Sequence, residues 1–277
     1  MEIARISTDT LESFALIIKE DAFELLKNGA SDTFAIGAVE DGMPVGVVVV
    51  RCTPPTGEII SLYVVEEYRR HKIGSMLCFE ALSLLMEQEG FTMLVAPFTE
   101  PDGEDVFRGF FESMSYDLQK VGTDYTVRME DVVEVMERKI KGAPKDTVKF
   151  YSELQNKEKN LLFKEGTDLS AYVREGTLRE DLSIVAFDDE FKKILGCVLL
   201  AETDGDLALV WLRADESAVL LFKLFDYVIE KLKKEKISIL HCPCINDRSD
   251  NLFQRTLGEN ISYDKIVSYE ALFSFAG

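Results

Sequence analysis

A short basic segment in the first half of the sequence has residue types and spacing that suit the binding of a phosphate. It consists of Arg69, Arg70, His71, Lys72, Ile73, Gly74 and Ser75. The first backbone N–H groups of a helix have no intrahelical partner and carry the positive end of the helix dipole. A helix that begins at this segment would therefore offer an anion site. Gly74 lacks a Cβ, so a phosphate can approach its backbone closely, and the Ser75 hydroxyl can donate to it. Charge alone leaves one alternative open, a solvated turn whose basic side chains face water.

The rest of the chain is strongly acidic, with a formal net charge of −19 over 277 residues. Such a field repels nucleic acid and anionic membranes and suits a cationic substrate such as an amine, although many proteins are acidic for solubility alone. No apolar run approaches the roughly 20 residues of a membrane helix, and Met1–Thr8 lacks the layout of a signal peptide. Five cysteines without a regular framework are typical of reduced thiols. We therefore expect a cytoplasmic protein without a nucleic-acid or membrane partner, and the oligomeric state stays open.

The basic segment lies between elements typical of an α/β domain. Thr8 or Asp9 can cap a helix that ends before Gly29, and Asp41-Gly42 supplies the positive φ angles of a hairpin turn. Hydrophobic periodicity then predicts a strand Glu58–Val64, a helix from Ile73 to near Gly90, a strand Met93–Ala96, a helix Glu104–Met114, a strand Tyr125–Met129 and a charged helix Asp131–Lys141. Gly142–Lys145 follows as the predicted linker.

The second half of the sequence repeats this order of elements faintly. Met93–Pro97 has a counterpart in Ile239–Pro243, and Pro44–Val48 has one in Ile194–Val198. Several such pairs in the same order favour a duplicated domain. The predicted elements are a hairpin Ser183–Leu200, a strand Leu207–Trp211, a helix Ser217–Lys234, a strand Ile237–Leu240, a helix near Asn251–Leu257 and a strand Tyr269–Phe275. We expect two α/β domains, residues 1–141 and residues 146–277.

The segment Arg69–Gly74 resembles the pyrophosphate turn of the GNAT acetyltransferase superfamily. In that family a strand, a V-shaped splay and the motif Arg/Gln-x-x-Gly-x-Gly/Ala lead into a helix that holds acyl-CoA, and here Lys72 stands in place of the first glycine. The resemblance covers about Phe34–Met129. It implies two tandem GNAT-like domains of α/β (α+β) class, each a central, mostly antiparallel mixed sheet flanked by helices. It also implies acetyl-CoA as acyl donor, without a metal, bound by Leu62, Tyr63, Val64, Arg69, Arg70, His71, Lys72, Ile73, Gly74 and Ser75.

The same resemblance implies direct transfer of an acetyl group to an amine. A backbone N–H near Val64 would polarise the thioester carbonyl. An ammonium is not a nucleophile, so a base must take its proton, and Glu58 at the start of the strand is the candidate. The sequence supports equally well the alternative that Glu58 is an exposed glutamate at the end of a strand, without a role in catalysis. Phe111 falls where the family has a tyrosine that acts as general acid. Phenylalanine cannot donate a proton, so Tyr116 or Tyr63 would have to protonate the thiolate unless it leaves unaided.

The second half departs from the family pattern at the phosphate turn. Trp211–Ser217 contains no glycine, and Asp215 and Glu216 would oppose a phosphate. We therefore expect a degenerate domain without CoA, which serves as scaffold, substrate wall or interface. His241–Cys244 has metal-binding residue types, but the chain offers no further ligands at suitable spacing, so a core strand is predicted.

Two functions follow from these observations. The first is an acetyl-CoA-dependent N-acetyltransferase acting on an amine of a small molecule or a peptide. The alternative is a CoA-binding or interaction protein with this fold and no catalysis.

Overall fold

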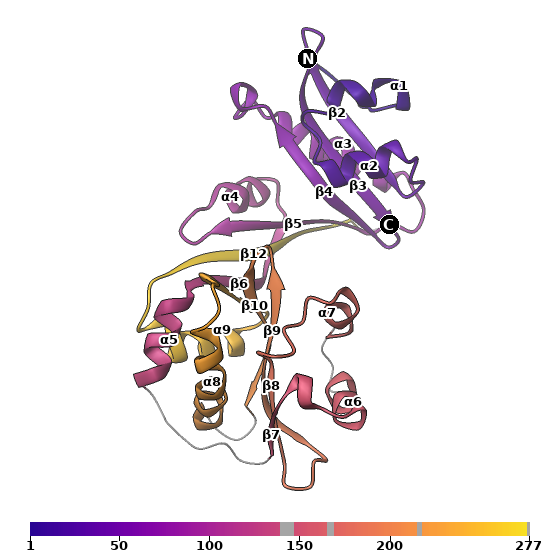
Figure 1. Cartoon of the computed structure of the whole chain (residues 1–277). Helices are drawn as coiled ribbons and strands as arrows, with labels where there is room; N and C mark the ends of the chain where they lie inside the picture. The colour runs from indigo at the N-terminus through magenta and orange to yellow at the C-terminus, as the bar shows by residue number, and fades with distance from the viewer. Residues whose placement is uncertain (139–146, 165–168, 215–217, 276–277) are drawn as a thin grey trace. The chain divides into compact units, whose positions relative to one another are not determined.

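The computed structural model describes residues 1–138, 147–164, 169–214 and 218–275 (Figure 1). They form two compact units, one of residues Met1–Val121 and Ser268–Gly277, the other of residues Gly122–Val267. Each unit is a mixed, mostly antiparallel sheet flanked by helices, so the predicted fold class is confirmed. The predicted linker Gly142–Lys145 lies outside the described residues.

The first unit is built on a sheet with the strand order β1-β2-β3-β4-β5-β12. Its strands are β1 (Glu2–Arg5), β2 (Thr33–Glu40), β3 (Met43–Thr53), β4 (Thr56–Val64), β5 (Met93–Pro101) and part of β12 (Tyr263–Ser274). Strands β1 to β4 pair antiparallel, whereas β4 and β5 pair parallel. Asp41 and Gly42 join β2 to β3 with φ angles of 50° and 78°, as the hairpin prediction requires.

Helices cover both faces of the β2–β4 sheet. Alternate residues of β3 point to opposite faces, so Val48 and Val50 pack in one cluster and Val47 and Val49 in another. The first cluster contains the buried face of α3 (Ile73–Met86), and the second contains residues of α1 (Thr8–Leu11) and α2 (Glu20–Lys27). Two covered faces explain why β3 is a continuous apolar run rather than an alternating one.

The predicted single helix from Thr8 to Gly29 is wrong in its middle. After α1 a 3-10 turn (Glu12–Phe14) follows, and Lys19 is extended with ψ 138° before α2 begins. The break lets Phe14 and Ala22 both reach the sheet while Leu16 stays 99% exposed. Burial on both sides of the break outweighs the helical periodicity of the sequence.

The second unit has the strand order β6-β11-β10-β9-β8-β7. Its strands are β6 (Asp117–Arg128, from residue 122), β7 (Val148–Phe150), β8 (Ile184–Phe187), β9 (Ile194–Thr203), β10 (Asp206–Ala214) and β11 (Ile239–Cys244). Its helices are α5 (Met129–Arg138), α6 (Asn156–Lys164), α7 (Leu169–Glu175), α8 (Ala218–Leu232) and α9 (Asp247–Phe253). A π-helical turn (Gln254–Gly258) continues α9.

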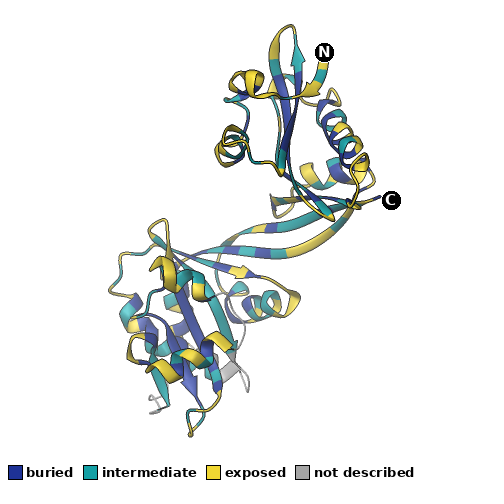
Figure 2. Ribbon diagram, turned by 90° about the vertical axis from the view of Figure 1, so that its right-hand side faces the viewer, coloured by how far each residue is buried: buried dark blue, intermediate teal, exposed yellow. Residues whose placement is uncertain are grey.

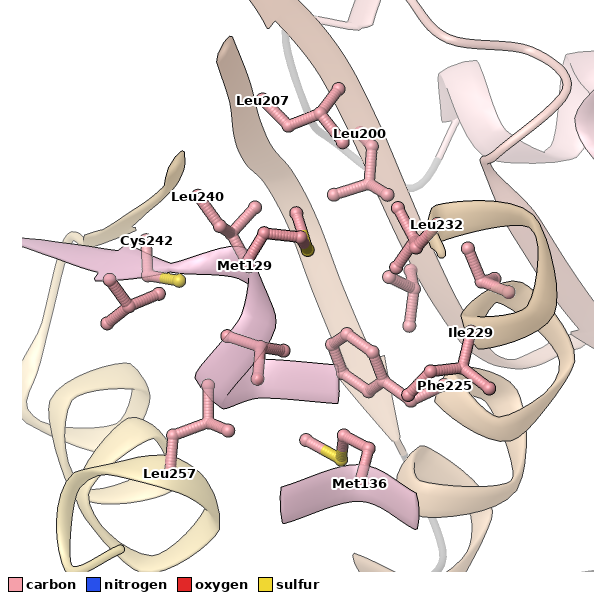
Figure 3. Packing of buried hydrophobic residues seen from close by; sticks show 14 of the residues in the cluster. Met129, Met136, Leu200, Leu207, Phe225, Ile229, Leu232, Leu240, Cys242 and Leu257 are labelled. Carbon is pink, nitrogen blue, oxygen red and sulfur yellow. The ribbon is translucent and has the colours of Figure 1, made fainter. Parts of the chain in front are cut away.

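The core of the second unit lies between its sheet and α5 and α8. Figure 3 shows Met129 and Met136 facing Phe225, Ile229 and Leu232, and all five belong to one buried cluster. In Figure 2 the strands β2 and β3 of the first unit and β8 and β9 of the second are largely dark blue, because both of their faces are covered.

The boundaries of the units differ from the expected division into residues 1–141 and 146–277. The chain passes from the first unit to the second within β6 and returns within β12. Residues Ser268–Ser274 of β12 therefore complete the first sheet, and α5 packs in the second unit although it precedes the expected linker. Strand pairing between distant segments, rather than composition, decides the boundary.

Candidate functional site

The first unit contains an opening between β4 and β5. In the described chain the two strands pair only through Thr56–Glu58 and Met93–Val95, although β4 runs on to Val64. On its other edge β4 stays paired with β3 as far as Val64, with Ile60 as an extra, bulged residue between the partners of Val49 and Val50. The splay therefore exposes one backbone edge of the segment that contains Leu62, Tyr63 and Val64.

The turn between β4 and α3 has an unusual backbone. Arg70 and Lys72 have φ angles of 66° and 65°, in the left-handed region, whereas His71 between them does not. This conformation costs a residue with a Cβ roughly 1–2 kcal/mol. Alternating backbone of this kind turns successive N–H groups toward one concavity, which suits an anion. Lys72 thus adopts a conformation that glycine would adopt more readily. The replacement of the motif's first glycine by lysine therefore does not prevent the chain from forming the turn.

The cations of the turn are not neutralised by neighbours. Arg69–Lys72 are all exposed, and within the described residues none of them forms an ion pair. Helix α3 begins directly after them at Ile73, so the N–H groups of Ile73, Gly74 and Ser75 belong to its unpaired first turn. The structure therefore brings the predicted basic residues and the helix N-terminus together.

Arg69 differs from its neighbours because it holds the turn to the strand. Its Nε donates to the carbonyl oxygen of Val64 at 2.9 Å, and its guanidinium lies 5.7 Å from the centre of the Tyr63 ring. The Val64 carbonyl is therefore engaged within the protein. Of the two backbone groups of Val64, the N–H is therefore the one considered as a donor to a bound thioester.

Gly74 packs against an aromatic ring of α4 (Val106–Ser113). A Cβ at Gly74 would lie 3.3 Å from two carbons of the Phe110 ring and 3.7 Å from Cγ2 of Val64. The absence of a side chain at Gly74 thus allows the Phe110 ring to pack closely against the backbone of α3. Sequence reasoning assigned that space to a phosphate.

A buried carboxylate holds α4 beside the splay. Glu100 at the end of β5 is 2% exposed and accepts hydrogen bonds from the backbone N–H groups of Phe107 and Arg108 and from Nε of Arg108 (2.9 Å). It therefore satisfies donors at the helix N-terminus. Sequence reasoning missed this residue; the signal was a glutamate a few residues ahead of a helix start, which also fits an exposed loop.

The aromatic residues near the splay divide by exposure. Phe111 is buried and stacks on Phe98 at 5.3 Å, so the expected acid position belongs to the core. Tyr116 is also buried, its hydroxyl has no partner among the described residues, and desolvation raises the pKa of its phenol. Tyr63 is 40% exposed. Of the two tyrosines that sequence reasoning considered, Tyr63 is the accessible one.

Glu58 lies at the last paired residue of β4, where the splay begins. A Cβ at Gly57 would meet Leu85 of α3, and Ile59 packs in the α3 cluster, so the side chain between them faces the opposite side of the sheet. Its Oε2 lies 3.7 Å from a guanidinium nitrogen of Arg51, its cross-strand partner, and both side chains are partly exposed. The carboxylate is thus accessible but shares its position with a cation.

The cysteines of the two cores are poor nucleophiles. Burial raises the pKa of the Cys78 thiol in α3 to about 12, and burial likewise raises the pKa of Cys242 in β11. A thiol so protonated does not attack at neutral pH. His241–Cys244 lie in β11, as the strand prediction has it, and the described residues contain no group suited to a metal.

The second unit repeats the splay between the corresponding strands. Strands β10 and β11 pair only through Leu207 and Ala208 with Leu240 and His241. Of the predicted degenerate turn Trp211–Ser217, residues 211–214 belong to β10, and residues 215–217 lie outside the described residues. Among the described helices of the chain, none has the length and apolar character needed to cross a membrane.

Comparisons with known proteins agree with this architecture. Residues 3–116 match the model of the acetyltransferase (GNAT) family. No curated protein matches the sequence. The fold is shared with a tandem GNAT protein from the clavulanic acid biosynthesis pathway (TM-score 0.59, 14% identity, 100% of this chain and 99% of that chain). It is shared also with a GCN5-related N-acetyltransferase from Sphaerobacter thermophilus (0.57, 10%, 97% and 95%).

A third similar structure is a GCN5-related glucosamine N-acetyltransferase region in a fungal multi-domain GH3 beta-N-acetylglucosaminidase (TM-score 0.60, 15% identity, 98% of this chain and 38% of that chain). At such identities the similarity shows the fold. The predicted tandem arrangement of two GNAT-like units is thereby confirmed.

Proposed function

We propose, from the match of residues 3–116 to the acetyltransferase (GNAT) family and the tandem GNAT fold of the chain, that this protein is an acetyl-CoA-dependent N-acetyltransferase. The proposal assigns the cofactor to the first unit. The observation that carries it is the turn Arg69–Lys72, whose two left-handed residues precede α3 beside an open strand edge.

The residues of the turn fit the diphosphate of such a cofactor. The N–H groups of Ile73, Gly74 and Ser75 would donate to its oxygens, Arg70 and Lys72 would supply positive charge, and the His71 ring would add an N–H donor. The open edge of β4 at Leu62–Val64 would bind the extended arm through backbone groups. Acetyl-CoA, when bound, supplies an acetyl group activated as a thioester.

The chain's own residues then have separate tasks. Glu58 would take the proton from the acceptor ammonium, directly or through water. A backbone N–H at Val64 would stabilise negative charge that develops on a carbonyl oxygen. The Tyr63 hydroxyl would deliver a proton to the departing group, because it is exposed where Phe111 and Tyr116 are buried.

The acceptor is proposed as an amine of a small molecule or a peptide. The net charge of −19 supports a cationic acceptor, since the field of the whole chain attracts it. Glucosamine is the acceptor in the description of one similar structure, so it belongs in any panel of test amines.

The second candidate is a CoA-binding or interaction protein without catalysis. The buried Phe111 at the expected position of the acid favours it. The two candidates share the cofactor site and differ in turnover.

Calorimetric titration with acetyl-CoA tests the shared part. We expect binding by the wild type and at least roughly tenfold weaker binding by Lys72→Glu, because a charge-assisted contact becomes repulsive. Lys27→Glu in α2 is the matched control, since it changes the net charge equally away from the turn. Absence of heat at millimolar acetyl-CoA rejects the cofactor assignment.

A thiol-release assay across an amine panel separates the two candidates. Release of CoA that depends on an added amine supports the transferase. Binding of acetyl-CoA with no release from any amine, including glucosamine and peptide N-termini, supports the binding protein.

A further inference from the structure

The second unit contains a cavity of about 1010 Å³ that the proposed function does not use. It lies where β10 and β11 separate after Ala208 and His241, and residues of α8, α9 and the π-helical turn line it. Its volume reaches the upper end of the range of small-molecule sites. All the residues that line it belong to residues 122–267, so the cavity is a property of the second unit alone.

The inner wall of the cavity is apolar. Leu209, Trp211 and Leu212 come from β10, and Phe225, Leu252 and Leu257 come from the surrounding helical segments. Phe225 and Leu257 are buried, and both are labelled in Figure 3 with Leu240 and Cys242, which line the cavity as well. Such a wall favours an alkyl or aromatic group of the ligand through burial of apolar surface.

Within the part of the chain that the structure describes, the charged residues of the lining all have one sign. Arg213, Arg248 and Arg255 line the cavity, and none of the described lining residues is an aspartate or glutamate. Arg248 and Arg255 are exposed, and neither forms an ion pair with any residue that the structure describes. In a chain with a net charge of −19, a cavity whose described lining contains three arginines and no carboxylate favours an anion.

The π-helical turn places part of this lining. Arg255, Thr256 and Leu257 lie in the wider turn Gln254–Gly258 that follows α9, and all three line the cavity. Gln254 fixes the turn, because its amide donates to the hydroxyls of Tyr125 at 3.0 Å and Tyr263 at 3.3 Å. Turns of this kind occur frequently at functional sites. Here it contributes both a cationic and an apolar residue to the lining.

We propose that this cavity binds a small amphiphilic anion, a single carboxylate or phosphate group attached to an alkyl chain. The alkyl chain lies against the apolar wall of Leu209, Leu212 and Phe225, and the head group lies at Arg248 and Arg255. A nucleotide cofactor fits less well, because the sequence after β10 has no counterpart of the basic, glycine-containing turn of the first unit. The site is distinct from the proposed acetyl-CoA site, so either can fail without the other.

The single tryptophan of the chain makes the cavity accessible to measurement. Trp211 is the one source of tryptophan fluorescence, and it lines the cavity. We expect octanoate and octyl phosphate to change this fluorescence saturably, with dissociation constants at least about tenfold lower than those of 1-octanol and octylamine, because the head group gains charge-assisted hydrogen bonds. The two anions together show whether the head group is a carboxylate or a phosphate.

The variant Arg248→Ala/Arg255→Ala tests the assignment of the head group. We expect it to weaken the binding of the preferred anion roughly tenfold or more and to leave 1-octanol unchanged. Arg174→Ala, an exposed arginine of α7 in the same unit that does not line the cavity, is the matched control. Far-UV circular dichroism verifies that each variant is folded.

Three results would overturn the proposal. The neutral alcohol binds as tightly as the anions, the double variant binds the anions as the wild type does, or CoA changes Trp211 fluorescence at lower concentration than either anion. The last result would make the second unit a cofactor site.

Discussion

Phe110 packs against Gly74 so closely that a Cβ added to the glycine would lie 3.3 Å from the phenylalanine ring. The contact joins α4 to the first turn of α3, and the proposed phosphate-binding N–H groups lie in that turn. The glycine of the motif therefore has a packing reason that holds even without a ligand. It follows that substitutions of Gly74 test two properties at once, and that a second residue must be varied to separate them.

The contact predicts coupling between the two positions. Gly74→Ala in the wild type gains helix propensity but forces the Phe110 ring to move, so we expect no gain or a loss in the free energy of unfolding. In a Phe110→Ala background the same substitution should stabilise by about 0.5 kcal/mol. Urea denaturation of the four proteins gives the coupling energy, expected to be at least about 0.5 kcal/mol. Additive effects would show that the ring does not restrain Gly74.

Lys72→Gly should stabilise the first unit, because Lys72 has a φ of 65°. Relief of the left-handed conformation should stabilise the folded state by roughly 1–2 kcal/mol. The greater freedom of glycine in the unfolded chain should destabilise the folded state by roughly 0.5–1 kcal/mol. We expect a net gain of about 0.5–1 kcal/mol in urea denaturation. His71→Gly is the control; its φ is not positive, so the same change should destabilise. A loss of stability in Lys72→Gly would contradict the assigned conformation.

Tyr116→Phe should change the alkaline stability of the protein. Burial raises the pKa of Tyr116, so above the unfolded pKa of about 10 the unfolded state loses this proton while the folded state retains it. Stability is therefore complete below pH 10 and falls as pH rises further, by up to about 1.4 kcal/mol per pH unit from this residue.

Urea denaturation at pH 7 and at pH 11 measures the effect. The phenylalanine variant should lose less stability between the two values than the wild type. Tyr63→Phe is the control at an exposed position and should keep the wild-type slope. Parallel slopes for the wild type and Tyr116→Phe would mean that the hydroxyl is solvated.

Glu100→Ala should be among the more destabilising substitutions in the first unit. It removes the acceptor of two backbone N–H groups at the start of α4 and the partner of Arg108. Unsatisfied buried donors cost roughly 1–3 kcal/mol, so a loss of about 2–3 kcal/mol is expected in thermal or urea unfolding. Glu112→Ala, an exposed residue of the same helix, should change stability by less than about 0.5 kcal/mol.

Glu58→Gln tests the proposed base. The amide cannot take a proton, so the rate of amine acetylation should fall roughly 10²–10⁴-fold while affinity for acetyl-CoA is retained. Glu80→Gln on the exposed face of α3 serves as control and should keep the wild-type rate. A fall of less than about tenfold would move the role to water or to the substrate.

The parts of the site that depend on local sequence were predictable. The Asp41-Gly42 hairpin, the strand before the basic turn and the helix after it all follow from turn chemistry and periodicity, and each is present. Lys72 shows the limit of such reasoning. Lysine disfavours the left-handed conformation that Lys72 adopts. The turn is held at both ends by β4 and α3, and this constraint outweighs the preference of one residue.

The rest of the site depends on contacts between distant segments. No local pattern distinguishes a buried Glu100 from an exposed loop glutamate, since its burial follows from the docking of α4. Likewise the sequence predicts a strand Tyr269–Phe275 but not its partner. The observed strand β12 begins earlier, at Tyr263, and its final residues belong to the first unit. Register and partner choice are set by which faces can be buried together.

The return of the chain to the first unit has a consequence for biosynthesis. Ala271 and Phe275 are part of the same buried cluster as Leu77 and Leu94, so the first unit needs residues that the ribosome adds after the whole second unit. The nascent first unit must wait, with an incomplete core, until residues 122–267 have been made. A fragment that stops near residue 141 lacks these side chains and should be recovered as an aggregation-prone product, although its length is that of a typical domain.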